Sequence, residues 1–175
     1  MTSIGKRRLG GLGIAGLILI ADLLVKWAMI AKLHLPQRQV IDLLPWFDLR
    51  WAQNFGVSFS MLTANSVEMR WLLVLLTGAI AVGVLFWMMY ETAMAEIGAL
   101  GLVLGGALGN IHDRASYGYV VDYADLHFGE FRPFQIFNLA DAAISVGVVI
   151  ILARSFLSRE KRDNTTGGQS APSES

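Results

Sequence analysis

The sequence predicts an integral membrane, all-α fold: a bundle of four transmembrane helices with a small extracytoplasmic β-sheet and a short surface helix. Two observations carry this prediction. Charged residues make up only 16% of the chain, whereas roughly 25% is usual for soluble domains. In addition, four segments are apolar over about the 20 residues that are needed to cross a bilayer, and they lie at 9–31, 69–90, 93–111 and 139–157.

Basic residues at the ends of these spans predict how the chain is oriented. Cytoplasmic flanks of membrane proteins are enriched in lysine and arginine. Basic clusters precede the first span and follow the fourth, at Lys6, Arg7, Arg8, Arg154, Arg159, Lys161 and Arg162. Both termini are therefore expected in the cytoplasm, with the loops 32–68 and 112–138 outside. We expect one membrane-embedded domain over 1–157 and a polar, disordered cytoplasmic tail over 158–175.

The first span carries two charged residues, Asp22 and Lys26. Residues four apart lie on the same face of a helix, so opposite charges at this spacing neutralise each other inside the bilayer. We interpret them as a structural pair that faces the bundle. Direct participation in a functional site is the alternative, because ionisable residues within spans are functional candidates.

The third span contains glycine at intervals of four, at Gly101, Gly105 and Gly109. Such spacing makes a groove into which the backbone of a neighbouring helix packs closely. The small residues at 77–79 and 142–147 are the partners we expect for this groove.

The loop after the first span predicts a small sheet at the membrane surface. Phe47, Leu49 and Trp51 alternate with charged residues, which is the period-two pattern of a strand with one apolar face. Its aromatic residues suit the membrane interface. Asn54 and Gly56 follow, and glycine allows a close approach of the backbone.

Acidic residues beside apolar sequence are the strongest functional signal in the chain. Asp122 and Asp141 both adjoin apolar segments on the same predicted side of the membrane. A carboxylate there loses hydration, so it is paired, protonated or used in chemistry. Two such groups in one water-poor pocket share a proton and are able to hydrolyse an amide. Composition alone does not separate them from Asp113 and Asp125.

Composition also excludes several kinds of site. The chain has no cysteine, which excludes a thiol nucleophile, disulfides and thiolate metal ligands. Its three histidines, His34, His112 and His127, lack a metal-binding spacing, so neither a metal nor another cofactor is expected. The formal net charge is zero, which suggests no nucleic-acid partner.

Two rival interpretations remain from the residues alone. In a small carrier or ion-coupled channel, Asp22, Lys26 and Asp141 would form a proton or cation path, but the helix pairs show no inverted repeat and no interrupted helices. Another type of intramembrane aspartyl protease is the second rival. It is disfavoured because the Gly-x-Gly-Asp motif of presenilin-like enzymes is absent.

Several motifs, in order along the four spans, resemble the lipoprotein signal peptidases, the bacterial type II signal peptidases. They are Asp22 with Lys26, Asn54-x-Gly56, Gly105-Gly106-Ala107-Leu108-Gly109-Asn110-x-x-Asp113-Arg114, Gly118-Tyr119-Val120-Val121-Asp122-Tyr123 and Phe137-Asn138-Leu139-Ala140-Asp141. The resemblance extends from the first span to the end of the fourth.

This resemblance implies an aspartyl endopeptidase of the bacterial cytoplasmic (inner) membrane, with Asp122 and Asp141 as its catalytic dyad at the extracytoplasmic face. The expected substrates are diacylglyceryl-modified prolipoproteins, cleaved just before the lipidated cysteine of the lipobox. The resemblance also implies inhibition by globomycin-type peptides, a membrane-lipid environment and no obligate protein partner. Supporting roles in the pocket fall on Asn54, Gly56, Asn110, Asp113, Arg114, Asn138 and Ala140.

Overall fold

The computed structural model describes residues 3–56 and 67–166, with side-chain surroundings over 4–56 and 67–157. Four of its helices are long and apolar enough to cross a membrane, which confirms the predicted fold class. In chain order the elements are α1 (Ser3–Trp27), the π-helical turn η1 (Ala28–Lys32), α2 (Leu35–Arg38), β1 (Val40–Leu44), β2 (Phe47–Asn54), α3 (Val67–Tyr90), α4 (Met94–Tyr117), β3 (Val120–Leu126) and α5 (Leu139–Thr166).

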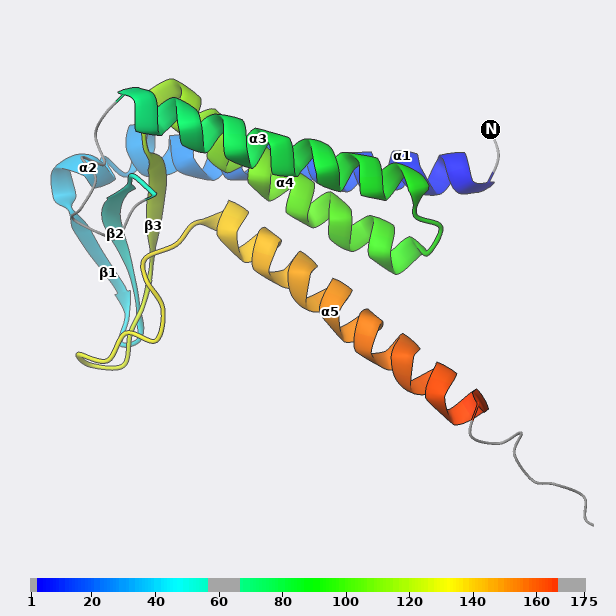
Figure 1. The fold of residues 1–175 in the computed structure, drawn as a ribbon. Coiled ribbons are helices and arrows are strands. Elements are labelled where there is room, and N and C mark those ends of the chain that lie inside the picture. Colours follow the sequence, from blue (N-terminus) through cyan, green and yellow to red (C-terminus); the bar gives the residue numbers. More distant parts are fainter. Residues whose placement is uncertain (1–2, 57–66, 167–175) are drawn as a thin grey trace, which may run out of the picture.

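Helix α4 is the centre of the bundle and packs against α1, α3 and α5 (Figure 1). Half of its most apolar window is buried, whereas the other three helices remain largely exposed. The exposed side chains of these helices are large and apolar, such as Leu75 on α3 and Val149 on α5. This pattern matches helices that face lipid, because lipid replaces the protein core as their apolar surroundings.

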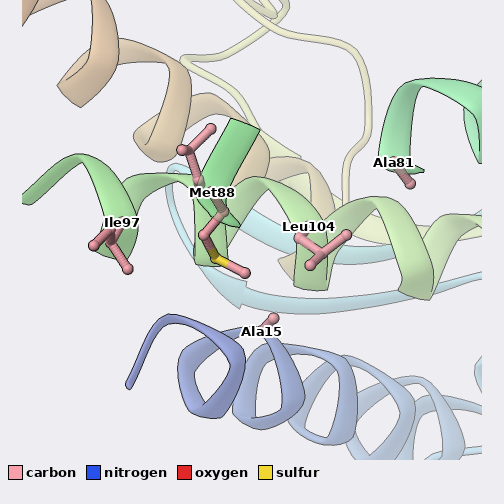
Figure 2. Packing of buried hydrophobic residues seen from close by; sticks show 6 residues of the cluster. Ala15, Ala81, Met88, Ile97 and Leu104 are labelled. Atoms are coloured by element: carbon pink, nitrogen blue, oxygen red, sulfur yellow. The ribbon is translucent and has the colours of Figure 1, made fainter. Parts of the chain in front are cut away.

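The apolar core of the bundle joins α1, α3 and α4 away from the sheet. Met88 of α3 and Ile97 and Leu104 of α4 are buried there beside Ala15 of α1 (Figure 2). Small residues on α1 leave room for the longer side chains of the other two helices, so that three helices share one core.

The glycine groove of α4 receives a different partner from the one predicted. A Cβ atom at Gly101 would lie 2.5 Å from the backbone oxygen of Gly11 on α1, and one at Gly105 would lie 2.5 Å from that of Ala15. Gly78, in the expected partner segment of α3, has no such neighbour within 4 Å. The expectation for α5 was better, because a Cβ at Gly147 would lie 2.6 Å from the oxygen of Ala99 on α4. Spacing reveals a groove but not which helix fills it.

A three-stranded antiparallel sheet with order β1-β2-β3 lies across one end of the bundle (Figure 1). Strands β1 and β2 come from the first long loop and β3 from the second. Leu49 of β2 and Ala124 of β3 are buried, and Val25 and Met29 at the end of the first span pack against the same cluster. The sheet is thereby fixed on the end of the first span.

Helices α4 and α5 both extend beyond the ends predicted for them. Helix α4 continues past residue 111 to Tyr117, where Gly118 adopts a left-handed conformation with φ 88°. Such a glycine is a common helix terminator. Helix α5 continues past residue 157 to Thr166. Residues 167–175 of the predicted tail, like 57–66 of the first predicted loop, lie outside the described residues.

Candidate active site

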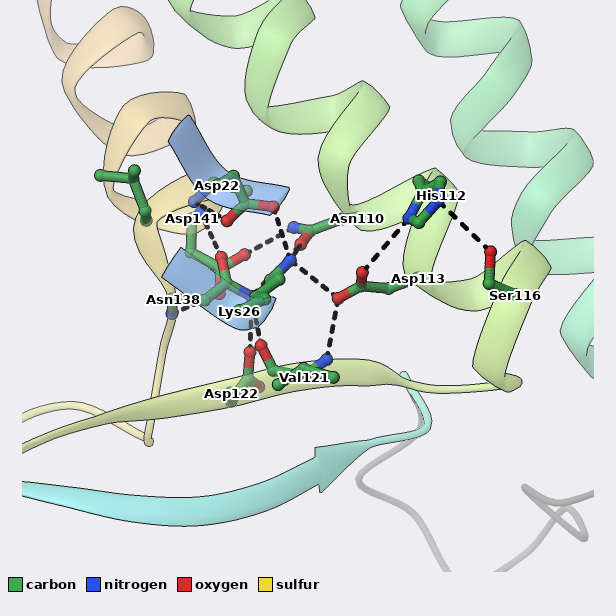
Figure 3. Close-up of polar contacts among 12 residues, drawn as sticks. Asp22, Lys26, Asn110, His112, Asp113, Ser116, Val121, Asp122, Asn138 and Asp141 are labelled. Atoms are coloured by element: carbon green, nitrogen blue, oxygen red, sulfur yellow. Dashed lines mark hydrogen bonds and ion pairs between the residues drawn. The ribbon is translucent and has the colours of Figure 1, made fainter. Parts of the chain in front are cut away.

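Asp122 and Asp141 are brought together at the sheet end of the bundle by one side chain, Asn138 (Figure 3). Asp122 lies on β3, and Asp141 lies in the first turn of α5. The Nδ2 atom of Asn138 donates a hydrogen bond of 2.7 Å to Asp122 Oδ1. Its Oδ1 accepts from the backbone N–H of Asp141 at 2.9 Å, and its own N–H donates to Asp141 Oδ2 at 3.2 Å. The last two bonds form a reciprocal helix cap. This cap fixes the carboxylate of Asp141 at the start of α5, and the side chain of the same Asn138 also binds the carboxylate of Asp122.

Asn110 of α4 holds the other side of Asp141. Its Nδ2 atom donates to Asp141 Oδ1 at 2.8 Å, and its Oδ1 lies 3.2 Å from Asn138 Nδ2. Both oxygens of Asp141 therefore accept hydrogen bonds. Because Asn110 is only 8% exposed, these bonds are formed with little competition from water.

A buried ionic cluster positions the residue before each of the two aspartates. Lys26 Nζ lies 2.7 Å from Asp22 Oδ2 and 2.7 Å from Asp113 Oδ2 (Figure 3). Asp22 also accepts from the backbone N–H of Ala140 at 3.1 Å, and Asp113 accepts from that of Val121 at 3.0 Å. Ala140 directly precedes Asp141, and Val121 directly precedes Asp122. The cluster thus links α1 and α4 to the backbone at both carboxylates.

The predicted pairing of Asp22 with Lys26 is present, but Asp113 is a third member that spacing did not indicate. Among the described residues, Asn110 links Lys26 to the two central aspartates, with its Oδ1 3.5 Å from Lys26 Nζ. One lysine between two carboxylates leaves a net negative charge, which is offset by the backbone N–H groups that both carboxylates accept from.

Tyr123 is a residue of this site that the sequence interpretation missed. Its hydroxyl accepts from the backbone N–H of Leu139 at 3.1 Å, at the start of α5. Burial raises the pKa of Tyr123 to about 12, and the charges of nearby carboxylates also raise it. The hydrogen bond from the N–H of Leu139 lowers the pKa but does not outweigh these effects. The first turn of a helix leaves N–H groups without partners, and here Tyr123 of β3, Asp22 of α1 and the capping residue Asn138 supply the acceptors. The position of Tyr123 directly after Asp122 was the feature of the sequence that could have identified it as a residue of the site.

Asp122 is almost completely buried, with 2% of its surface exposed. The pKa of Asp122 is raised from 3.8 to about 6. Burial is the largest cause of this increase, and the charge of Asp141 is the second. Hydrogen bonds from Asn54 and Asn138 and the charge of Lys26 oppose the increase. A carboxyl group that keeps its proton toward neutral pH is suited to donate it during a reaction.

A cavity of about 660 Å³ opens beside Asp122 between the end of β2 and the segment before α5. Asn54, Gly56, Arg132 and Phe134 are among its lining residues. Gly56 has φ 82° and donates its N–H to Asn54 Oδ1 at 2.8 Å, so this turn needs the conformational freedom of glycine. The cavity gives a peptide-sized group access to Asp122.

Among the described residues, the side chains of Arg114 and Ala140 form no hydrogen bond or ion pair with the two aspartates that the structure records. The charge of Arg114 nevertheless acts on both aspartates, and Ala140 directly precedes Asp141. The Arg114 Nε atom is buried without a hydrogen-bond partner in the described part of the chain. Its guanidinium lies beside Gly56 and contributes, with Asn110, to a second cavity of about 170 Å³. Ala140 is fully buried, and a Cβ at Gly106 would meet its backbone oxygen.

Asp125 is separated from the two central aspartates by its own partners. Its Oδ2 lies 2.8 Å from Arg50 Nε and 3.2 Å from Arg132 Nε. Burial acts to raise the pKa of Asp125, but the hydrogen bonds and charges of both arginines outweigh it and lower the pKa from its ordinary value. Over residues 3–56 and 67–166, no group of three or more His, Cys, Asp or Glu side chains is arranged to hold a metal ion.

Comparisons with known proteins show the family of the chain. The family model of signal peptidase (SPase) II matches residues 14–157. The lipoprotein signal peptidase of Rhizorhabdus wittichii is 47% identical over 152 residues, which cover 87% of this chain and 88% of the relative. That of Sphingopyxis alaskensis is 48% identical over 151 residues, 86% of this chain and 87% of the relative.

A solved structure described as a bacterial membrane enzyme has a TM-score of 0.71 to this chain, covers 94% of both chains and is 21% identical, which supports the fold alone. The family model and the relatives cover most of the chain, from the first span to the end of the fourth. The chain therefore belongs to the signal peptidase II family of membrane peptidases.

Proposed function

We propose that the chain is an aspartyl endopeptidase that cleaves diacylglyceryl-modified prolipoproteins just before the lipidated cysteine, with Asp122 and Asp141 as its catalytic dyad. Membership of the family implies the removal of signal peptides from prolipoproteins. The observation that supports the finer proposal is the bridge through Asn138, which joins two carboxyl groups from different elements beside the larger cavity.

The hydrogen bonds and the burial of the two aspartates support a different role for each of them. Both oxygens of Asp141 accept hydrogen bonds, from Asn110 and from the N–H of Asn138, so Asp141 acts as the carboxylate. It takes a proton from a water molecule, whose oxygen attacks the carbonyl carbon of the scissile amide. Asp122, whose pKa is raised to about 6, gives its proton to the carbonyl oxygen. The amine then leaves with the proton held by Asp141, the carbon–nitrogen bond breaks, and Asp122 recovers its proton from the tetrahedral intermediate.

The supporting residues keep this geometry ready before the substrate arrives. Asn54, Gly56 and Asn138 hold the cavity side, while the cluster of Asp22, Lys26 and Asp113 holds the backbone beside both aspartates. A preorganised site does not have to reorganise its dipoles during the reaction. Neither a metal nor a cofactor enters this mechanism.

The proposal includes a location and a substrate path. The enzyme lies in the bacterial cytoplasmic membrane with both termini inside, so the sheet and the dyad are at the extracytoplasmic face. The acyl chains of the substrate stay in lipid while the peptide enters the cavity beside Asp122. Peptides of the globomycin type are expected to inhibit the enzyme.

The test is cleavage of a diacylglyceryl-modified prolipoprotein by the purified protein in lipid vesicles. Asp122→Asn and Asp141→Asn should each lose nearly all activity while remaining folded in a thermal melt. Asp42→Asn, which changes an exposed carboxylate on β1, is the matched control and should cleave normally. An inert wild type, or normal cleavage by either dyad variant, would refute the proposal and favour the carrier interpretation.

A further inference from the structure

Large apolar side chains are exposed together at one end of the sheet. They are Leu43 and Leu44 at the end of β1, Trp46 of the β1–β2 turn, and Phe128 and Phe131 of the segment after β3, with exposed fractions of 52%, 46%, 47%, 60% and 66%. We call these five residues the sheet tip. A contiguous apolar surface of this kind marks an interaction site.

Backbone bonds hold the two segments of the sheet tip together. The N–H of His127 donates to the oxygen of Trp46 at 3.0 Å, and His127 Nε2 lies 2.9 Å from Asp48 Oδ2. Phe128 and Phe131 exchange backbone hydrogen bonds of 2.8 and 3.2 Å. The sheet tip is therefore one ordered surface, although its two segments are far apart in sequence.

The part of the sheet next to the sheet tip shows what its apolar residues do where they have a partner. There Leu49 and Ala124 are buried against the end of the first span and Leu35 of α2. In Figure 1 the sheet continues past the outer end of α5, so that the sheet tip extends sideways beyond the bundle. The apolar surface of the sheet is therefore covered by protein around Leu49 and Ala124, whereas the described residues leave it uncovered at the sheet tip.

The helices identify what lies next to this uncovered surface. Since α1, α3, α4 and α5 have membrane-spanning length, the space alongside α5 is occupied by lipid. The sheet rests on the residues where the first span ends, which places it at the level of the membrane interface. Tryptophan and other amphipathic or aromatic side chains are enriched at that level. The sheet tip contains Trp46 and two phenylalanines, with the exposed Glu130 between the phenylalanines.

We propose that the sheet tip inserts into the headgroup and upper acyl region of the lipid leaflet at the sheet end of the bundle. Phe131 is followed directly by Arg132, and Phe134 comes soon after; both line the cavity beside Asp122. Contact of the sheet tip with lipid therefore sets the depth of one cavity wall in the membrane. This anchor does not depend on the identity of the substrate or on the catalytic roles of the two aspartates.

Depth measurements with a single fluorescent label test this proposal directly. The chain contains no cysteine, so Trp46→Cys and Phe131→Cys each give one labelling site for an environment-sensitive fluorophore. Gln37→Cys on α2, exposed and away from the sheet tip, is the aqueous control, and Val149→Cys on the exposed face of α5 is the lipid control. The proteins are placed in vesicles of phosphatidylcholine with a minor fraction of phosphatidylglycerol.

Two quenchers distinguish water from lipid at each label. Lipids with a doxyl group near the headgroup end of the acyl chain should quench labels at 46 and 131 at least about twofold more than the label at 37. Iodide in the water should quench them correspondingly less. If both labels are quenched by iodide like the label at 37 and are unaffected by doxyl lipids, the sheet tip does not enter the membrane and the proposal is wrong.

A second copy of the chain is the other possible cover for this surface. Nanodiscs that hold one protein each separate the two cases, because the lipid contact persists in them and a contact between copies does not. Protection from iodide that disappears in these nanodiscs would overturn the proposal. If either labelled variant melts below the wild type, Phe128→Cys provides a replacement site on the same surface and the same two outcomes apply.

Discussion

Asp122→Asn should make the protein more stable at neutral pH although it removes activity. The folded protein raises the pKa of Asp122 from 3.8 to about 6, mainly because the carboxyl is buried. A raised pKa stabilises the fold at pH values below 3.8, and this contribution is lost as the pH rises through about 6. The wild type therefore carries the full cost of a buried carboxylate above pH 6, and asparagine carries none.

The magnitude follows from the two pKa values. The difference between 3.8 and about 6 corresponds to about 3 kcal/mol of unfolding free energy at pH 7.5, and to about 1 kcal/mol at pH 4.5. For a chain of this size, each kcal/mol shifts the melting temperature by about 2–4 °C. The expected advantage of Asp122→Asn is thus roughly 6–12 °C at pH 7.5 and roughly 2–4 °C at pH 4.5.

Thermal melts of the purified proteins in one detergent at both pH values measure this difference. All other titrating groups are shared, so their effects cancel when the variant is compared with the wild type, except for that of Asp141, whose charge interacts with Asp122. Asp42→Asn is the control, since this carboxylate is exposed, and its melting temperature should follow that of the wild type at both pH values. A lower melting temperature for Asp122→Asn at pH 7.5, or an advantage that is equal at both pH values, would refute the reasoning.

Four further outcomes are expected. The kcat/KM for a lipidated substrate should fall about tenfold per pH unit above pH 6, because the protonated form of Asp122 is required; a flat profile would contradict this. Gly109→Ala should lower the melting temperature by the equivalent of about 1–3 kcal/mol, because the new Cβ would lie 2.5 Å from Asp22 Oδ2. Gly78→Ala is the control and should not lower it, because among the described residues no atom lies within 4 Å of its new Cβ. Tyr123→Phe, which removes the acceptor for the first N–H of α5, should cost about 1 kcal/mol of stability, and an unchanged melt would count against that hydrogen bond. Asp22→Asn should reduce the yield of folded protein more than the activity per folded molecule; a normally folded but inactive variant would show that this carboxylate takes part in the chemistry.

Among the elements of the fold, the four spans were the easiest to predict from the sequence. Hydropathy is a local property, and a bilayer demands the same length of apolar helix wherever it occurs. Helix ends were harder. Residues 112–114 were expected at the start of the second outer loop, but they continue α4, because Asp113 finds buried partners on α1 and β3. Those partners could not be known before the helices were assembled.

What the sequence by itself determined is the family, the membrane class and a short set of acidic candidates, since motif order and hydropathy are properties of the chain alone. The resemblance to the family singled out Asp122 and Asp141 among these candidates, and the tertiary structure supplied the contacts that distinguish the four. Asp125 is paired with two arginines, Asp113 belongs to the cluster around Lys26, and Asp122 and Asp141 share Asn138. Each of these contacts joins elements that are distant in sequence. The physical reason is that the environment of a buried carboxylate depends on which charges and donors fold around it, and no local pattern encodes those neighbours.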